Sequence, residues 1–406
     1  MQTLATSEPH QLLGMAHIMR LAFAGSDLSA ITSHLTSRIQ SNALDSSALM
    51  DLSIVLQLNA SPTLAIELQT EALRQHQYFE LKSNPENPAL RLLAIMGPGD
   101  VMANTPIEFL VEHSDIALSI LYLGEGLPVP THIPKHDVAF VAVCESDQNQ
   151  FLLHQLAEIM QYWPRPFLNE PSRIAQLSRN RVSQCLASAK GVAVSDAIRV
   201  SRSQLSELAN PNDSSGCHFP MIARPLDSHA GHGLSKLDGS NQLERYLAEH
   251  KALEFFIAPF IDYRSDDGMY RKYRIAIIDG RPFAAHMAIS RHWMVHYLNA
   301  DMLNNEVNRQ TEAEFMRSFD QAFGLKHKIA LKAIDQKIGL NYYSIDCAET
   351  RDGKLLVFEL DSGAVVHAMD PVDLFPYKPP QMQKVFEAFQ NMLRRKSTTS
   401  LSRLAA

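Results

Sequence analysis

Short apolar runs alternate with helix-like segments between residues 90 and 170, and this alternation limits the folds open to the chain more than any other feature. The runs LRLLAIM, ALSILYL and DVAFVAVC have the length and composition of buried strands. Between and after them lie NTPIEFLVEHS and QNQFLLHQLAEIMQYW, which have helical spacing. Strands that alternate with helices form parallel sheets covered on both faces. We therefore predict a small doubly wound α/β domain over residues 90–170.

The region before it, residues 1–82, has a different pattern. Its apolar spacing is helical from about residue 9 to 80, with no strand signal, in HQLLGMAHIMRLAFAG, DLSAITSHLTSRIQ, DSSALMDLSIVLQLN and SPTLAIELQTEALRQH. Short turns separate these segments, as in antiparallel helix pairs. The region resembles a degenerate pair of tetratricopeptide-like repeats. Three interpretations stay open: a helical cap on the next domain, a groove for a peptide or protein partner, and a homodimer contact.

Composition and charge exclude several classes of protein. A chain of 406 residues is too long for one core, and 46% hydrophobic residues is ordinary for a folded protein. The formal charge of -7, with no long basic block, argues against nucleic acid as the partner. Four dispersed cysteines argue against a thiolate zinc site and a disulfide framework. No run is long enough to span a bilayer and no signal-peptide pattern is present, so we expect a cytoplasmic protein without a membrane partner.

Residues 171–395 form the third predicted region, and residues 396–406 a flexible tail. After the strand-like PMIARP comes LDSHAGHGL, in which Gly231 and Gly233 allow backbone N–H groups to approach an anion closely. Arg224 ends the preceding strand and places a permanent cation beside this expected flap. Taken alone, the Gly-His-Gly sequence is more typical of a hairpin turn than of an anion-binding flap.

A basic hairpin follows in MYRKYRIAIIDGRPFAAHMAISRHWMVHY, where Asp279-Gly280 is a good turn signal. Strand alternation places Lys272 and Arg274 on the same face. The segment carries several further cationic or titratable side chains: Arg271, Arg281, Arg291, His286, His292 and His296. The pattern indicates either a solvated basic face or a site that neutralises a polyphosphate.

An acidic hairpin lies in NYYSIDCAETRDGKLLVFELDSG, with its turn at Asp352-Gly353. Glu359 and Asp361 are two residues apart and therefore share a face, and Asp346 on the first strand can face Glu359 across the pair. Three converging carboxylates without counter-ions would repel one another strongly. A Mg²⁺ ion shared with phosphates offsets this repulsion and takes the oxygen ligands that it prefers. We therefore expect Asp346, Glu359 and Asp361 to hold Mg²⁺.

The order of these motifs carries a family resemblance. The Arg-Pro strand with its glycine-containing flap, FFIAPFID, the basic hairpin, and Asp346 with FELDSG together resemble the ATP-grasp superfamily, in particular the glutathione-synthetase-like and D-alanine-ligase-like enzymes. The resemblance covers residues 90–395. It implies a small α/β domain followed by an ATP-grasp domain, residues 171–395, in which ATP lies between two α+β halves. It also implies γ-phosphoryl transfer to a carboxylate and attack of an amine on the acyl phosphate.

The resemblance assigns roles by position. It implies a small-molecule or peptide substrate that bears a carboxylate, and an amine co-substrate. Arg274 and Arg291 are expected to bind the γ-phosphate or the reacting carboxylate. His286 or His296 is expected to be a base for the amine. Packing or substrate contacts are the alternative for the two histidines. The nucleotide contacts implied are Arg224, Ser228, His229, Gly231, Gly233, Arg179, Pro259, Phe260 and Ile261.

Two positions depart from the superfamily pattern. Asp361 stands where asparagine is common, and Arg224 stands where lysine is usual. Arg179 lies in SRNR before a helix, where a solvated helix start is an equal alternative to a nucleotide contact. Two other functions stay open: a small-molecule kinase with the same fold, and a non-catalytic nucleotide-binding scaffold that binds protein through its N-terminal helices.

Overall fold

The structure is a computed structural model of the chain, and it describes residues 10–208, 219–226, 228 and 231–399. The chain folds into two compact units. Unit 1 contains residues 1–175, 340–343 and 362–406, and unit 2 contains residues 176–339 and 344–361. Among the described residues, none of the helices combines the length and the apolar character that crossing a bilayer requires.

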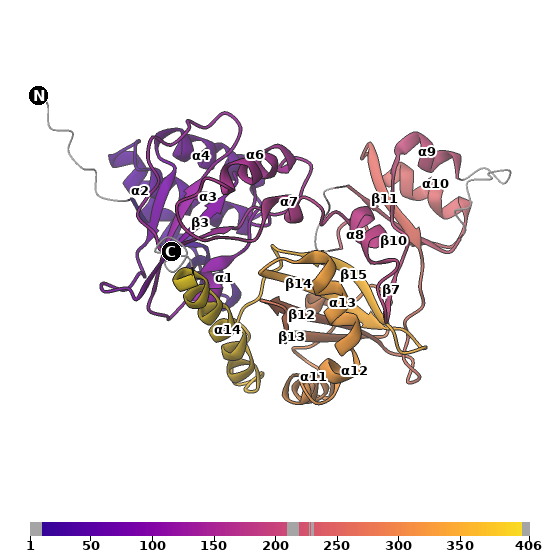
Figure 1. The fold of residues 1–406 in the computed structure, drawn as a ribbon. Helices are drawn as coiled ribbons and strands as arrows, with labels where there is room; N and C mark the ends of the chain where they lie inside the picture. The colour runs from indigo at the N-terminus through magenta and orange to yellow at the C-terminus, as the bar shows by residue number, and fades with distance from the viewer. Residues whose placement is uncertain (1–9, 209–218, 227, 229–230, 400–406) are drawn as a thin grey trace, which may run out of the picture. The chain divides into compact units, whose positions relative to one another are not determined.

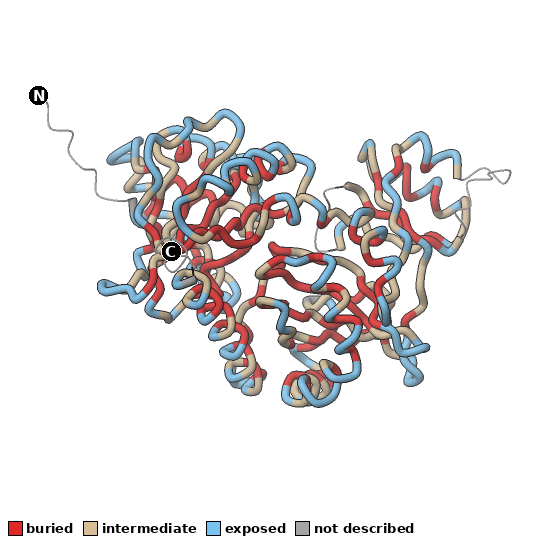
Figure 2. The backbone as a smooth tube through the Cα atoms, viewed as in Figure 1, coloured by how far each residue is buried: buried red, intermediate tan, exposed pale blue. Residues whose placement is uncertain are grey.

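A six-stranded sheet in the order β1-β2-β4-β3-β5-β6 is the centre of unit 1 (Figure 1). Its strands are β1 (His10–Leu12), β2 (Tyr78–Leu81), β3 (Leu90–Met96), β4 (Ile116–Tyr122), β5 (Val138–Val141) and β6 (Phe167–Leu168). The last four pair in parallel, and nearly all of β3 is buried because helices cover both faces of such a sheet (Figure 2). The connecting helices are α5 (Ile107–Val111), between β3 and β4, and α6 (Gln150–Met160), between β5 and β6, and α7 (Pro171–Ile174) follows β6. This confirms the parallel α/β arrangement predicted from the alternating pattern.

The first 82 residues contain strands as well as helices. The predicted helices form as α1 (Met15–Phe23), α2 (Ser29–Ser41), α3 (Ser46–Leu58) and α4 (Pro62–Gln75). However, β1 pairs in parallel with β2, and β2 pairs antiparallel with β4, so this region extends the same sheet. The prediction of a region without strands was therefore wrong, because three- and four-residue strands are too short to show an alternating pattern.

Two buried carboxylates cap the start of α1. The Leu13 and Gly14 N–H groups donate to Asp51 (2.8 and 3.2 Å), and the Ala16 N–H donates to Glu108 (2.8 Å). Gly14 has φ 91°, and a Cβ there would lie 2.6 Å from Glu108 Oε2, so only glycine fits. Burial raises the pKa of Asp51 to about 6 and the pKa of Glu108 to about 7.

The C-terminal helix α14 (Lys378–Thr399) packs on unit 1. The Phe389 ring lies against Phe140 and Tyr342, with centroids 5.6 and 5.4 Å away, and the Gln390 side chain donates to the Leu110 carbonyl. The sequence placed most of this helix in the ATP-grasp region, so the contacts correct that boundary. Residues 396–399, predicted as part of a flexible tail, are helical, and residues 400–406 lie outside the described part of the chain.

Unit 2 contains two sheets, in the orders β10-β9-β11-β8 and β13-β12-β14-β15-β7. The strands of the first are β8 (Ile198–Ser201), β9 (Met221–Pro225), β10 (Ser235–Leu237) and β11 (Glu254–Pro259). Those of the second are β7 (Val192–Val194), β12 (Tyr270–Ile278), β13 (Arg281–Ser290), β14 (Tyr342–Glu349) and β15 (Leu355–Asp361). Both predicted hairpins, β12/β13 and β14/β15, are therefore present.

Helices accompany each sheet of unit 2. Those near the four-stranded sheet are α9 (Arg202–Glu207) and α10 (Ser240–Glu249), whose Leu243, Tyr246 and Leu247 pack into one core with residues of β9 and β11. The others are α8 (Arg179–Leu186), α11 (Glu306–Ser318), α12 (Phe323–Lys326), α13 (Lys328–Ile338) and the 3-10 turn η1 (Tyr297–Asn299). Unit 2 thus contains two sheets, each accompanied by helices, and the division into two ATP-grasp halves stays a prediction.

The buried carboxyl of Glu108 makes the stability of unit 1 dependent on pH. Its pKa is about 7 in the folded chain against an ordinary 4.5, so its stabilising contribution is complete at acid pH and is lost as the pH rises through about 7. We expect the free energy of unfolding to fall by on the order of 3 kcal/mol between about pH 4 and about pH 8. Glu108→Gln should remove this part of the pH dependence, whereas the part due to Asp51, whose pKa is also raised, should remain.

The measurement is urea unfolding followed by the fluorescence of Trp163, which lies in unit 1, in a Trp293→Phe background. The control is Glu71→Gln, whose exposed side chain lies on α4 and whose loss should leave the pH dependence intact. Equal pH dependence with and without Glu108 would show that this carboxyl is ionised in the folded protein.

Candidate functional site

The β14/β15 register brings the predicted carboxylates together in unit 2. Asp346 is the direct partner of Glu359, and Ser344 is the partner of Asp361, with an irregularity in the pairing after Asp346. Glu359 and Asp361 are two residues apart on β15 and so share a face. The side chain of Asp346 is 1% exposed, and that of Glu359 is 26% exposed. The register confirms the predicted pairing of Asp346 with Glu359.

Two cations from β12 neutralise Asp346. Arg274 binds it with two parallel hydrogen bonds, from Nε to Oδ1 (2.7 Å) and from Nη2 to Oδ2 (2.9 Å). The Lys272 ammonium lies 2.6 Å from Oδ2. Both cations can reach the same carboxylate because they are two residues apart on one strand. Burial opposes the charges of Asp346 and Arg274. Even so, Arg274 and Lys272 hold the pKa of Asp346 well below its usual range, and Asp346 raises the pKa of Arg274.

Arg179, the first residue of α8, forms an ion pair with Glu359. Burial works against ionisation of Glu359, but Arg179, with a smaller contribution from Lys272, holds the pKa of this carboxyl below its ordinary value. The predicted nucleotide contact Arg179 is therefore brought to the carboxylate hairpin and is not simply a solvated start of a helix. No local sequence pattern predicts its pairing with Glu359.

Arg224 ends β9 beside the predicted flap. It is 9% exposed, its Nε donates to Ser228 Oγ (3.1 Å), and Nη2 donates to the Ser228 carbonyl. Burial, then the charge of Arg179, lowers the pKa of Arg224 to about 10, while Glu359 acts in the opposite direction. These electrostatic interactions place Arg224 near the Arg179–Glu359 pair. Arg224 is therefore a buried cation whose hydrogen bonds hold Ser228 at the start of the predicted flap.

The glycines of the predicted flap both have positive φ, 80° at Gly231 and 65° at Gly233. A Cβ on Gly233 would lie 2.6 Å from Pro225 Cδ, so the turn packs too closely on β9 for any other residue. The Tyr246 hydroxyl donates to the Gly233 carbonyl (2.9 Å) and fixes the end of the turn on α10. His229, also predicted as a contact, lies outside the described residues.

The predicted base-binding segment, Pro259 to Ile261, begins at the last residue of β11. The Lys236 ammonium lies 4.8 Å from the centre of the Phe260 ring, and the Trp293 ring meets Phe260 edge-on at 5.7 Å. The Ser195 hydroxyl donates to the Pro259 carbonyl. Sequence analysis assigned no role to Lys236 or Trp293, because neither lies in a recognisable motif.

The predicted catalytic residues of β13 and its following segment differ in placement. His286 is the strand partner of Arg274, and its ring stacks on Tyr297 at 4.8 Å. Burial, then Lys272 and Arg274, lowers the pKa of His296, which keeps this imidazole neutral at pH 7. Arg291 is exposed just beyond the end of β13. His296 is therefore electrostatically linked to the ion-pair cluster.

Two buried polar side chains of α11 fasten the segment after β13. Glu312 is fully buried and accepts from the Met287 N–H (3.0 Å) and the Tyr297 hydroxyl (3.2 Å). One turn earlier, the Asn308 amide donates to the Ile289 and Ala300 carbonyls (both 3.3 Å). These contacts fix both ends of the segment that carries Trp293 and His296. The sequence signal available was only the i, i+4 spacing of two polar residues on a helix.

The carboxylates of the β14/β15 hairpin are possible ligands of a Mg²⁺ ion. Within the described ranges, no three or more His, Cys, Asp or Glu side chains are grouped in a way that could hold a metal ion. Asp346 and Glu359 nevertheless supply hard oxygen ligands, and side-chain cations now contact both. Mg²⁺ in nucleotide sites commonly takes one or two carboxylates and completes its shell with phosphates and water. The donor set therefore fits a Mg²⁺ ion that arrives with a polyphosphate.

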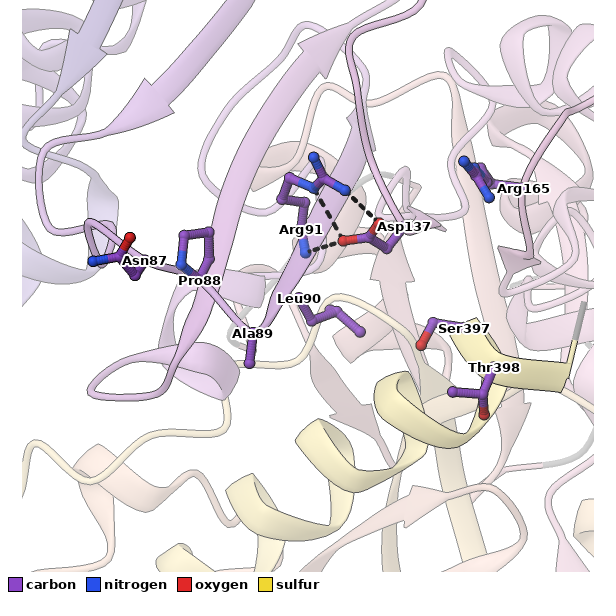
Figure 3. Close-up of a pocket in the computed structure, with 9 residues that line it drawn as sticks. All are labelled: Asn87, Pro88, Ala89, Leu90, Arg91, Asp137, Arg165, Ser397 and Thr398. Atoms are coloured by element: carbon purple, nitrogen blue, oxygen red, sulfur yellow. Dashed lines mark hydrogen bonds and ion pairs between the residues drawn. The ribbon is translucent and has the colours of Figure 1, made fainter. Parts of the chain in front are cut away.

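A surface groove of ≈ 560 Å³ in unit 1 is a separate feature (Figure 3). None of the predicted site residues lines it. The Arg91 guanidinium and backbone N–H all donate to Asp137, so the charge of this arginine is already neutralised. The groove is lined by Asn87, Pro88, Ala89, Leu90, Arg91, Asp137, Arg165, Ser397 and Thr398.

No protein-family model matches the chain, and no curated protein matches it. Among solved structures, it is similar to the D-alanine–D-alanine ligase from Bacillus anthracis complexed with ATP, with 15% identity and a TM-score of 0.48 over 78% of this chain and 99% of that one. It is also similar to the VanG D-Ala:D-Ser ligase from Enterococcus faecalis, with 10% identity and a TM-score of 0.46 over 75% of this chain and 99% of that one. A third similar structure is the D-alanine–D-alanine ligase from Coxiella burnetii, with 11% identity and a TM-score of 0.45 over 78% of this chain and 99% of that one. These are distant likenesses and assign no activity.

The bidentate pair between Arg274 and Asp346 predicts a large effect on stability. Arg274→Met removes the guanidinium that contacts both oxygens of a buried carboxylate, and breaking such a pair costs about 3–5 kcal/mol. The matched control is Arg271→Met on the same strand, whose partner Asp267 is half exposed, so its loss should cost about 1 kcal/mol or less.

Urea unfolding followed by Trp293 fluorescence in a Trp163→Phe background reports on unit 2. If Arg274→Met and Arg271→Met lowered the free energy of unfolding by similar amounts, this would contradict a special role for the buried pair.

Proposed function

We propose that the protein is an ATP- and Mg²⁺-dependent carboxylate–amine ligase that acts through an acyl phosphate. One observation carries this proposal: cations and carboxylates from separate stretches of unit 2 alternate in a single cluster. Arg179 pairs with Glu359, Lys272 and Arg274 pair with Asp346, and Asp346 adjoins Glu359 in the sheet. Such a cluster has the chemistry to bind a polyphosphate together with a divalent cation.

In this proposal the side-chain cations supply most of the positioning and charge neutralisation of the phosphates. Phosphoryl transfer needs positioning and charge neutralisation more than covalent chemistry. Arg224, Arg179 and Lys272 would contact the phosphates, and Arg274 would bind the γ-phosphate or the reacting carboxylate. Mg²⁺, held by Asp346, Glu359 and Asp361, would add charge neutralisation on the phosphates when bound. Ser228, Gly231 and Gly233 would lie close to the phosphates and exclude water from the acyl phosphate.

A neutral imidazole is what proton removal from an amine requires. His296 meets this condition because burial and the neighbouring cations lower its pKa. We therefore assign His296 as the base for the incoming amine, with His286 as a stacking support through Tyr297. Arg291 is assigned to the carboxylate of the acid substrate. Pro259, Phe260 and Ile261 are assigned to the nucleotide base.

The substrate class proposed is a small molecule or peptide that bears a carboxylate, with an amine as co-substrate. The protein contact of the N-terminal helices and the homodimer stay predictions. Most of the first two turns of α3 is buried, which supports a packing role for the centre of that region.

The test is incubation of the full chain with ATP, Mg²⁺ and panels of acids and amines, with detection of ADP, phosphate and the product mass. We expect ADP formation that requires both substrates, and a loss of at least about 100-fold in Glu359→Gln and Asp361→Ala, since each removes a carboxylate that would hold the metal on the phosphates. The matched control is Asp352→Asn in the exposed turn of the same hairpin, which should retain full activity.

Other outcomes separate the rival functions. AMP with pyrophosphate would indicate adenylation, and a phosphorylated product that accumulates without amine would indicate a kinase. Nucleotide binding without any substrate-dependent turnover would indicate a scaffold. Full activity in Glu359→Gln would contradict the assignment of this carboxylate to the metal.

A further inference from the structure

Asp346 has more cationic partners than its single charge requires. Arg274 alone contacts both of its oxygens in bidentate geometry. Lys272 then adds a third contact, 2.6 Å from Oδ2, although that oxygen already accepts from Arg274. The Asp346 side chain is almost fully buried, so these contacts saturate a carboxylate with little access to water. One of the two cations is therefore surplus to the pairing of Asp346.

Lys272 is the cation that can leave. A guanidinium held by two parallel hydrogen bonds has a fixed geometry, whereas an ammonium is a point charge on a flexible stem. If Lys272 moved away, Arg274 would still satisfy both oxygens of Asp346. Lys272 also acts electrostatically on Glu359 and on His296, so it lies within reach of the whole cluster.

Without nucleotide, a divalent cation would have to compete with side-chain cations for the carboxylates of the cluster. Both contacted carboxylates, Asp346 and Glu359, already have cationic partners, and no ready three-ligand cage is found in the part of the chain that the structure describes. The ion would have to displace the Lys272 ammonium from Asp346. A polyphosphate changes this balance because its oxygens can accept the Lys272 ammonium and can also complete the shell of the metal.

We propose that Lys272 is an exchangeable counter-ion that keeps Asp346 closed to divalent cations until nucleotide phosphates take up its ammonium. This rests on the proposed function, because it assumes that the cluster binds a nucleotide with a metal. It adds a role that the nucleotide assignment does not require: Lys272 couples the two ligands, so each raises the affinity of the site for the other. The site then admits the metal together with the nucleotide.

The experiment measures Mn²⁺ binding to the full chain without nucleotide, by the loss of the free Mn²⁺ electron paramagnetic resonance signal. Wild type should bind Mn²⁺ weakly, and Lys272→Met should bind it at least about tenfold more tightly, which corresponds to about 1.4 kcal/mol. The matched control is Lys326→Met, which removes the ammonium that pairs with Glu349 in the same unit and should leave Mn²⁺ binding unchanged. Adding Asp346→Asn to Lys272→Met should abolish the gain and so locate the ion.

A second arm measures the coupling directly. ADP, with correction for its own chelation of Mn²⁺, should tighten Mn²⁺ binding to wild type by a factor at least about tenfold larger than in Lys272→Met. Lys272→Gln serves as a second neutral variant, and Trp293 fluorescence in a Trp163→Phe background verifies that unit 2 is folded.

Equal Mn²⁺ affinity of wild type and both Lys272 variants without nucleotide would overturn the proposal, as would equal coupling to ADP. The binding measurements involve no turnover, so they can succeed or fail independently of the ligase assay. Mn²⁺ coupling without any ligase product would support the role of Lys272 and contradict the proposed reaction. Ligase turnover with unchanged Mn²⁺ binding in the Lys272 variants would do the reverse.

Discussion

The buried pair between Arg274 and Asp346 is the interaction on which the arrangement of unit 2 depends. A carboxylate that is 1% exposed is tolerated only when both oxygens are satisfied, and Arg274 satisfies them with two short hydrogen bonds. This requires β12 and β14 to be neighbours in one definite register, as they are in the sheet. A slip of one residue would turn Arg274 to the other face and leave Asp346 buried without a partner.

The same constraint organises the groups around the pair. Because Asp346 and Glu359 are direct partners across β14 and β15, a second carboxylate is forced next to the first, and it needs its own cation. That cation, Arg179, comes from the start of α8. Arg224 follows from β9 of the other sheet, and its lowered pKa reflects both burial and the charge of Arg179. The cluster thus draws on both sheets of unit 2.

Local patterns predicted the hairpins and the pairing of Asp346 with Glu359, because alternation and turn residues act over a few positions. Contacts between residues that are far apart in the sequence were not predictable in this way. Nothing in the sequence of α14 says that Phe389 packs on Phe140, since an apolar stripe does not identify its partner. Arg179 and Glu359 are 180 positions apart, and their pairing is a product of the fold. The strands β1 and β2 were missed because they are too short to show a period.

Asp361 and Arg224 have opposite electrostatic consequences. An aspartate at position 361 adds a negative charge beside Glu359, which opposes phosphate and favours a metal ion. An arginine at position 224 cannot lose its proton easily even when it is buried, so it keeps a full positive charge near Glu359. Lysine in the same buried place would lose much of its charge, because desolvation lowers the pKa of an ammonium further towards neutrality. Arginine at 224 therefore keeps its positive charge in spite of burial, and this charge offsets part of the negative charge of Glu359.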